Sequence, residues 1–184
     1  TGGIAETVWG ALDPKSEGFQ EAGNWTGVLF AVQAIGSILW AMVLPMFKSV
    51  KVGYSLSLVL GAVGFISTYF IHDQYLLFLS FILIGCAWAA MLAMPFALLT
   101  NSLSGKSMGS YLGLFNCTIC LPQIVAALVG GFLFKTFGGE KVELISNGVA
   151  TEVQSGQIMM LVIAGVSLLL AAVAVFGIST RKAK

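Results

Sequence analysis

Long apolar runs constrain the fold of this chain more than any other feature of its sequence. Five runs approach or exceed the roughly 20 residues that a helix needs to cross a bilayer. Only 9% of the residues are charged, against about 25% in a typical soluble domain. We therefore predict an all-α integral membrane protein. The predicted membrane helices are Asn24–Phe47, Gly53–Ile71, Tyr75–Thr100, Gly109–Phe134 and Gln157–Ser179.

The residues before the first run are mixed in character. The segment "TGGIAETVWGALDPKSEGFQEAG" is too polar and too rich in glycine and proline for a complete span. Its first dozen residues are interpreted as the end of a truncated sixth helix, because the chain starts at Thr1 without a signal peptide. We therefore expect residues 1–23 to be a helix end and an extracytoplasmic connection, residues 24–179 the transmembrane bundle, and residues 180–184 a cytoplasmic tail.

The distribution of charge predicts the orientation in the membrane. Five spans place the two termini on opposite sides, and one side then receives six of the nine Lys and Arg residues. The opposite side receives all eight acidic residues. An excess of Lys and Arg marks the cytoplasmic face, so the C-terminus is expected in the cytoplasm. The protein itself is expected in a plasma membrane or bacterial inner membrane. The residues on the predicted cytoplasmic side are Lys48, Lys51, Lys106, Arg181, Lys182 and Lys184.

Several classes of function are disfavoured by what the sequence lacks. No basic run points to nucleic acid, and no nucleophile–base pair or metal-binding cluster points to an enzyme or a cofactor. Cys86, Cys117 and Cys120 lie in apolar segments and are interpreted as small packing residues. No Asp, Glu, Lys, Arg or His lies within a predicted span. Such residues are the usual mark of a proton relay, so a coupling carboxylate is expected outside this chain.

Amides within the fourth run are the most informative polar residues. Asn116 and Gln123 are seven residues apart, which is two helical turns, so they share one face. Pro122 lies beside them and frees a backbone carbonyl near Thr118. The amides could bind a hydroxyl-rich ligand in a cavity, since each offers donors and an acceptor. They could equally join neighbouring helices through hydrogen bonds, and the sequence leaves both interpretations open.

Two further residues are candidates for a binding site. Gln33 is the one amide in the middle of the first span, with the same two interpretations. Trp88 shares a face of the third span with Pro95, seven residues later. An aromatic face can stack on a sugar ring, although a tryptophan in an apolar span can also serve packing alone.

Small residues at regular spacing indicate close helix packing. Gly105, Gly109 and Gly113 follow one another at four-residue intervals, a pattern that lets two helices approach closely. We expect these glycines, together with Pro95 and Pro122, to act in packing or gating rather than in ligand binding.

The order of these motifs resembles a known family. The run "PFALL", a short loop, "GSYLGLFN" and "LPQI" resemble helices ten and eleven of sugar:cation symporters of the major facilitator superfamily. The similarity is to the sucrose and maltose type, related to the glycoside–pentoside–hexuronide group. "ETVWGALDPKSEGFQEAGNWTGVLFAV" also resembles their connection between helices seven and eight.

This resemblance implies a specific architecture and role. The chain would be the carboxyl-terminal half of a twelve-helix transporter: the end of helix seven, then helices eight to twelve. Helices seven, eight, ten and eleven of the family face the substrate, which implies substrate contacts at Gln33, Trp88, Asn116 and Gln123. Its partners would be a sugar, a co-transported cation, the amino-terminal six-helix half and the lipid bilayer. One departure is "FKSVKVGY", which keeps only the basic character of the family's loop between helices eight and nine.

The expected function is therefore transport of a glycoside with a cation, most simply H⁺, by alternating access. Two alternatives remain open, and the first belongs to a different class of function. A non-transporting membrane scaffold or pore module would suit five spans with abundant small residues. A transporter that exports hydrophobic compounds would have a more apolar cavity and no need for the Asn and Gln stripe.

Overall fold

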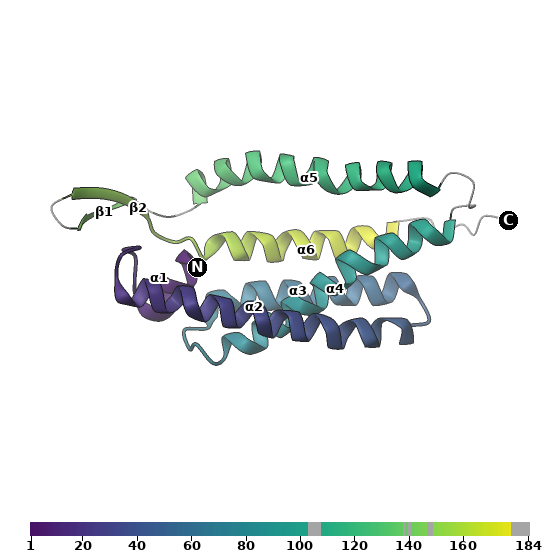
Figure 1. Cartoon of the computed structure of the whole chain (residues 1–184), viewed down its shortest axis with the longest axis horizontal. Helices are drawn as coiled ribbons and strands as arrows, with labels where there is room; N and C mark the ends of the chain where they lie inside the picture. Colours follow the sequence, from purple (N-terminus) through teal and green to yellow (C-terminus); the bar gives the residue numbers. More distant parts are fainter. Residues whose placement is uncertain (103–107, 138, 140, 147–148, 178–184) are drawn as a thin grey trace.

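The fold is a bundle of long helices with one small β-hairpin (Figure 1). The computed structural model describes residues 1–102, 108–137, 139, 141–146 and 149–177. A short helix α1 (Gly2–Trp9) precedes four long helices: α2 (Glu17–Val43), α3 (Val50–Phe70), α4 (Leu77–Ser102) and α5 (Met108–Phe137). A single 3-10 turn, Leu44–Met46, extends α2. Strands β1 (Lys141–Ser146) and β2 (Val149–Gln154) then lead into α6 (Met159–Gly177).

Five of these helices are long and apolar enough to cross a membrane, as predicted. The main difference in boundaries is at the first span, because α2 begins at Glu17 instead of Asn24. The Ser16 hydroxyl caps this helix by accepting the backbone N–H of Phe19 at 3.3 Å. The polar residues after Ser16 thus extend the helix beyond its apolar part, where the sequence suggests an irregular connection.

Helices α2, α3, α4 and α6 form the packed part of the bundle, with α4 between α2 and α3 and with α3 against α6. Glycines allow the backbones to approach closely. A Cβ atom added at Gly64 of α3 would lie 2.6 Å from the Ser80 carbonyl oxygen of α4. One added at Gly165 of α6 would lie 3.0 Å from the Ala62 carbonyl oxygen of α3. Any larger residue would separate these helices.

Hydroxyl groups within the bundle are hydrogen-bonded. Ser55 of α3 donates to the Ala172 carbonyl of α6 at 3.0 Å, and Trp40 of α2 donates its indole N–H to the Ser57 hydroxyl at 2.8 Å. Ser67 and Ser80 join α3 to α4 at 2.8 Å. An unsatisfied polar group in an apolar medium costs free energy. Each of these hydrogen bonds satisfies a polar group in the core and also joins two helices.

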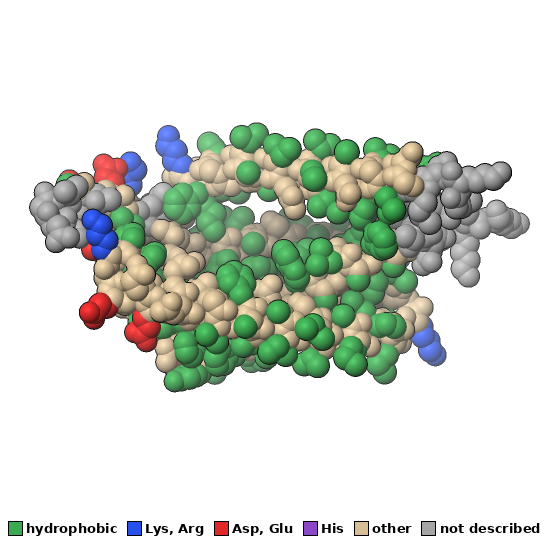
Figure 2. Space-filling view, viewed as in Figure 1, with side chains coloured by type: hydrophobic (Ala, Val, Ile, Leu, Met, Phe, Trp, Pro, Cys, Tyr) green, Lys and Arg blue, Asp and Glu red, His purple; other side chains and the backbone are tan. Residues whose placement is uncertain are grey.

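Helix α5 differs from the other long helices because it lies beside α6 at the margin of the structure (Figure 1). None of the 18 residues in its most apolar segment is buried. Figure 2 shows an open hollow between α5 and the remainder of the bundle. Phe115 contacts Phe96 of α4, with ring centroids 6.4 Å apart.

A β-hairpin lies between α5 and α6, where the sequence was not predicted to form strands. β1 and β2 pair antiparallel, with Lys141 opposite Gln154 and Ser146 opposite Val149. The hairpin extends from the end of the bundle where α5 ends and α6 begins, close to α1 (Figure 1). Among the side chains visible in Figure 2, the acidic ones gather at this same end.

Candidate functional site

A cavity of about 320 Å³ lies where α1, α2, α4 and the start of α6 meet. Phe65 contributes to its wall from α3. Its size falls within the lower part of the range of small-molecule sites, which are about 300–1,000 Å³. The lining residues are Thr1, Gly2, Gly3, Ile4, Thr26, Phe30, Gln33, Phe65, Phe81, Ile84, Trp88, Gln157, Met160 and Leu161.

Two of the four predicted substrate contacts meet at this cavity. Gln33 reaches it from the middle of α2, and Trp88 from the middle of α4. Both are accessible, since Gln33 is half-buried and Trp88 is 52% exposed. An amide and an indole from different helices therefore border the same space, 55 residues apart in sequence.

A close helix crossing sets the relative position of these two side chains. Gly85 of α4 lies so near α2 that a Cβ atom there would collide with the Gln33 carbonyl oxygen and lie 3.0 Å from the Ser37 nitrogen. The Ser37 hydroxyl lies 2.9 Å from the Gly85 carbonyl oxygen and 3.0 Å from that of Gln33. Trp88 follows Gly85 by about one helical turn. The crossing thus places Gln33 at a fixed backbone contact and Trp88 about one turn from it.

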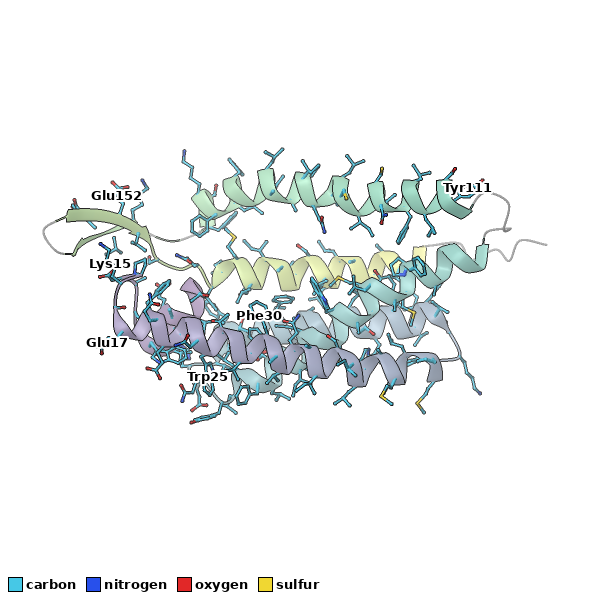
Figure 3. All side chains as sticks on the ribbon, in the orientation of Figure 1. Lys15, Glu17, Trp25, Phe30, Tyr111 and Glu152 are labelled. Carbon is cyan, nitrogen blue, oxygen red and sulfur yellow. The ribbon has the colours of Figure 1, made fainter. Side chains whose placement is uncertain are left out.

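Most of the remaining wall is apolar and was missed from the sequence. Phe30 lies one turn before Gln33 on the side of α2 that faces α6 (Figure 3). Phe81 and Ile84 precede Trp88 by seven and four residues, so they lie on the same face of α4. This helical spacing from the two predicted residues was a usable signal. No comparable signal existed for Phe65 or Met160, which the fold brings from other helices.

The polar groups of the wall are few. Thr26 is buried, and its hydroxyl donates to the Ala22 carbonyl at 2.7 Å within α2. This bond satisfies the Thr26 proton locally and leaves the Gln33 amide as the central polar group of α2 in the cavity. In the described part of the chain, no group of three His, Cys, Asp or Glu residues could hold a metal ion.

Glu6 has a definite structural partner. Its carboxylate accepts the backbone N–H of Gly156, at 2.7 Å to Oε2 and 3.0 Å to Oε1. Gly156 immediately precedes Gln157, which lines the cavity. The carboxylate therefore joins α1 to the segment that leads into α6, beside the cavity and not inside it.

Asn116 and Gln123 are not brought to this cavity. Both side chains are exposed on α5, as is Pro122 between them. The Thr118 hydroxyl donates to the Phe115 carbonyl at 2.7 Å, within the same helix. Pro95 lies inside α4, half-buried. The four predicted contacts thus divide into a pair at the cavity and a pair on the separate helix.

The structure shows no close helix contact at the predicted glycines that it describes. A Cβ atom added at Gly109 or Gly113 would meet nothing within 4 Å, so the packing role expected for them stays a prediction. Gly105 lies outside the described residues. The close approaches occur instead at glycines of the packed helices, such as Gly64 and Gly85.

An ion pair lies in the hairpin, outside the spans. Lys141 of β1 and Glu152 of β2 form an exposed ion pair at 2.6 Å. The hydrogen bond from Lys141 lowers the pKa of the Glu152 carboxyl, with a further contribution from the lysine charge. The same bond raises the pKa of Lys141. This pair is separate from the cavity and joins the two strands.

Comparison with protein families shows which family this chain belongs to. The Major Facilitator Superfamily model matches residues 6–184, nearly the entire chain. The chain belongs to the Major Facilitator Superfamily. Comparison with curated proteins and with solved structures gave no match.

Membership of the Major Facilitator Superfamily identifies a membrane transporter. Transporters of this kind bind substrate between helices at membrane depth, and the cavity described above lies between α1, α2, α3, α4 and α6. The expected helical membrane fold is thereby confirmed.

Proposed function

We propose that this chain is the carboxyl-terminal half of a transporter that moves a glycoside together with a cation. The proposed substrate is a disaccharide such as sucrose or maltose, and the proposed cation is H⁺. The observation that carries this proposal is the shared cavity wall of Gln33 and Trp88, between the middle parts of α2 and α4.

The chemistry of these two side chains suits a sugar. The Gln33 amide offers two donor hydrogens and one acceptor oxygen, which match neutral hydroxyl groups. The Trp88 ring presents an apolar face that can stack on the C–H surface of a pyranose. An amide and an aromatic ring on the same cavity wall can therefore bind the hydroxyl groups and the apolar face of a sugar without any charge.

Two of the predicted substrate contacts lie on α5, away from the cavity, and the proposed transporter accounts for them as follows. An amino-terminal six-helix half would cover the exposed face of α5 and supply the opposite wall, so that Asn116 and Gln123 would also meet the substrate. The two halves would rock about this central site to give alternating access. The coupling acid would lie in that half, and the C-terminus would be cytoplasmic in a plasma or bacterial inner membrane.

The first test is uptake of labelled sucrose, maltose and a monosaccharide by cells that express the full-length protein, with and without a protonophore. Disaccharide accumulation that collapses with the protonophore supports H⁺-coupled transport. Accumulation that survives it supports the sugar and contradicts H⁺. Absence of uptake for all three sugars would contradict the proposed substrate class.

Variants at the cavity connect this measurement with the structure. Gln33→Leu and Trp88→Ala are each expected to raise the KM for the sugar about fivefold or more, because each loses about 1 kcal/mol of binding energy. Val63→Ala is a control, since Val63 is 49% exposed on α3 and does not line the cavity. Normal KM in both cavity variants at normal expression would refute the assignment.

A second candidate function is the export of hydrophobic compounds, favoured by the strongly apolar wall. Phe30, Phe65 and Phe81 surround a space with few polar groups. Accumulation of a lipophilic cationic dye in cells distinguishes the two functions. Expression would lower dye accumulation if the protein exports such compounds, whereas a glycoside importer would leave it unchanged.

A further inference from the structure

A second hollow lies at the end of the bundle opposite the hairpin, where α2 ends and α3 begins (Figure 1). Its volume is about 290 Å³, and the residues that line it come from both of these helix ends and from α4. All of them are apolar. None of them lines the cavity that contains Gln33 and Trp88, so the two hollows are separate. We call this second hollow the apolar groove.

Packed side chains fix the shape of the apolar groove. Leu44 and Met94 line it and are only 5% and 7% exposed, within one buried cluster. The Phe47 ring lines it from the other side and lies against α3, since a Cβ atom added at Gly53 would be 3.1 Å from that ring. The centroid of the same ring lies 6.2 Å from that of Trp40. The groove is therefore formed by the packed bundle itself and requires no occupant to create it.

The surroundings of the apolar groove indicate a hydrocarbon occupant. Ala41 and Ala93 line the groove with small, exposed side chains, so it opens at the surface of the bundle. Met42 and Met46 beside it are 71% and 79% exposed, as expected for a surface in contact with lipid tails. An unfilled space loses dispersion contacts with its walls. Since every lining residue is apolar, an acyl chain fills such a space without leaving any polar group unpaired.

The charge beside the apolar groove is positive. Lys48 directly follows Phe47 in the sequence. Lys51 directly follows Val50, and both Phe47 and Val50 line the groove. No Asp or Glu occurs in residues 22–72 or in α4, and the acidic side chains visible in Figure 2 gather at the hairpin end. A negatively charged head group is therefore attracted to this end of the bundle and to no acidic end of it.

The side of the membrane also suits an anionic lipid. Lys48 is exposed and Lys51 is half-buried, and their flexible stems allow the ammonium groups to reach the head-group layer. Both lysines lie on the side that the distribution of Lys and Arg predicts to be cytoplasmic. Anionic lipids give that leaflet its negative surface potential.

We propose that the apolar groove binds one anionic phospholipid, with an acyl chain between α2 and α4 and the phosphate beside Lys48 and Lys51. The groove alone would accept the chain of any lipid, whereas the lysines select a negative head group. Each lysine is expected to contribute about fivefold to the affinity. The lipid site is separate from the transport cavity, so this inference does not depend on which solute is carried.

The test measures lipid binding to the full-length protein in detergent by native mass spectrometry. Phosphatidylglycerol, which carries one negative charge, and phosphatidylcholine, which is zwitterionic, are titrated separately with the same acyl chains. The parent protein is expected to bind one phosphatidylglycerol at least tenfold more tightly than phosphatidylcholine, because the two lysines together favour the anion by about 25-fold.

Two variants each remove one feature of the site. Lys48→Gln combined with Lys51→Gln should lower the affinity for phosphatidylglycerol about 25-fold and leave that for phosphatidylcholine unchanged. Ala93→Phe places a ring in the groove and should lower the affinity for both lipids about tenfold or more, because ring and acyl chain cannot occupy the same space. Lys135→Gln and Ala171→Phe are the matched controls, since both residues are exposed and do not line the groove.

The lipid affinities decide for or against the proposal. The expected losses in the two variants, with unchanged affinities in the controls and folded protein confirmed by size-exclusion chromatography, support it. Equal affinity of the parent for both lipids would overturn it, as would unchanged phosphatidylglycerol affinity in the double lysine variant. Absence of bound lipid, together with a lower unfolding temperature of Ala93→Phe, would assign the groove to contact with the amino-terminal half and would also overturn it. Failure of sugar uptake would contradict the proposed substrate while leaving these affinities intact.

Discussion

Small and polar residues make different contacts in two regions of the molecule, helix α5 and the packed helices α2, α3, α4 and α6. In the packed helices, glycines lie against neighbouring backbones and hydroxyls such as that of Ser55 bond across to another helix. In α5, Gly113 faces open space and Thr118 bonds within its own helix. Small and polar residues alone therefore do not define a contact, because their role depends on whether another helix is present.

The largest expected difference between these regions concerns glycine. Gly85→Ala should lower the free energy of unfolding by about 1–3 kcal/mol, since the added methyl group collides with the Gln33 carbonyl. Gly113→Ala is the matched control on α5 and should leave stability unchanged or slightly raised. Thermal unfolding of the solubilised protein measures both. Equal effects would show that α5 is as tightly packed as the other helices.

For transport, in contrast to stability, we expect a large effect from residues on α5. The double variant Asn116→Leu and Gln123→Leu is expected to raise the KM for the sugar about tenfold, through loss of hydrogen bonds to hydroxyl groups. Its thermal stability should remain normal, because both side chains are exposed. Uptake kinetics and unfolding are measured on the same preparations. Lost stability with normal KM would instead identify the amides as bonds between helices.

A smaller effect is expected at one hydrogen bond between helices. Ser55→Ala removes the bond to the Ala172 carbonyl and should cost about 0.6 kcal/mol, the average for such bonds between membrane helices. Thr118→Ala, on α5, removes only a bond within one helix and should have less effect. The difference in unfolding midpoint between these two variants measures how much more the packed helices depend on such bonds. A larger loss from Thr118→Ala would contradict this expectation.

The smallest effect is expected at the hairpin ion pair. The pKa of Glu152 is lowered in the folded state, so its contribution to stability is present above the ordinary carboxyl pKa and is lost as the pH falls below it. Near neutral pH the exposed pair should contribute little, and Glu152→Gln should leave the melting temperature unchanged. A clear decrease at pH 7 that is absent at pH 3 would show a stronger role for the pair.

The sequence predicted the elements of this fold better than their assembly. Apolar runs located all five spans because a bilayer requires long apolar helices. The hairpin was missed although "KVELIS" and "VATEVQ" flank an Asn-Gly pair, a combination typical of a two-residue turn. The start of α2 was missed because the polar residues after Ser16 continue the helix outside the apolar run.

The sequence also predicted only part of the candidate site, because it shows which residues are unusual within a helix but not how the helices assemble. Gln33 and Trp88 stood out as polar or amphipathic groups in the middle of apolar spans, and both border the cavity. Phe65 and Met160 could not be found, because their positions depend on how separate helices pack. Asn116 and Gln123 were correctly placed on a helix but not at this cavity, since periodicity gives a face and not its neighbour.

The length of α2 has a consequence for the turn that precedes it. Its 27 residues span about 40 Å at 1.5 Å per residue, whereas the hydrocarbon layer is about 30 Å thick. The early start at Glu17 therefore carries the turn before α2 into the headgroup layer, where water is present. Backbone groups of that turn can be hydrated there, which would be impossible among lipid tails. The two extra turns of α2 thus leave an irregular segment of the chain where water can satisfy its polar groups.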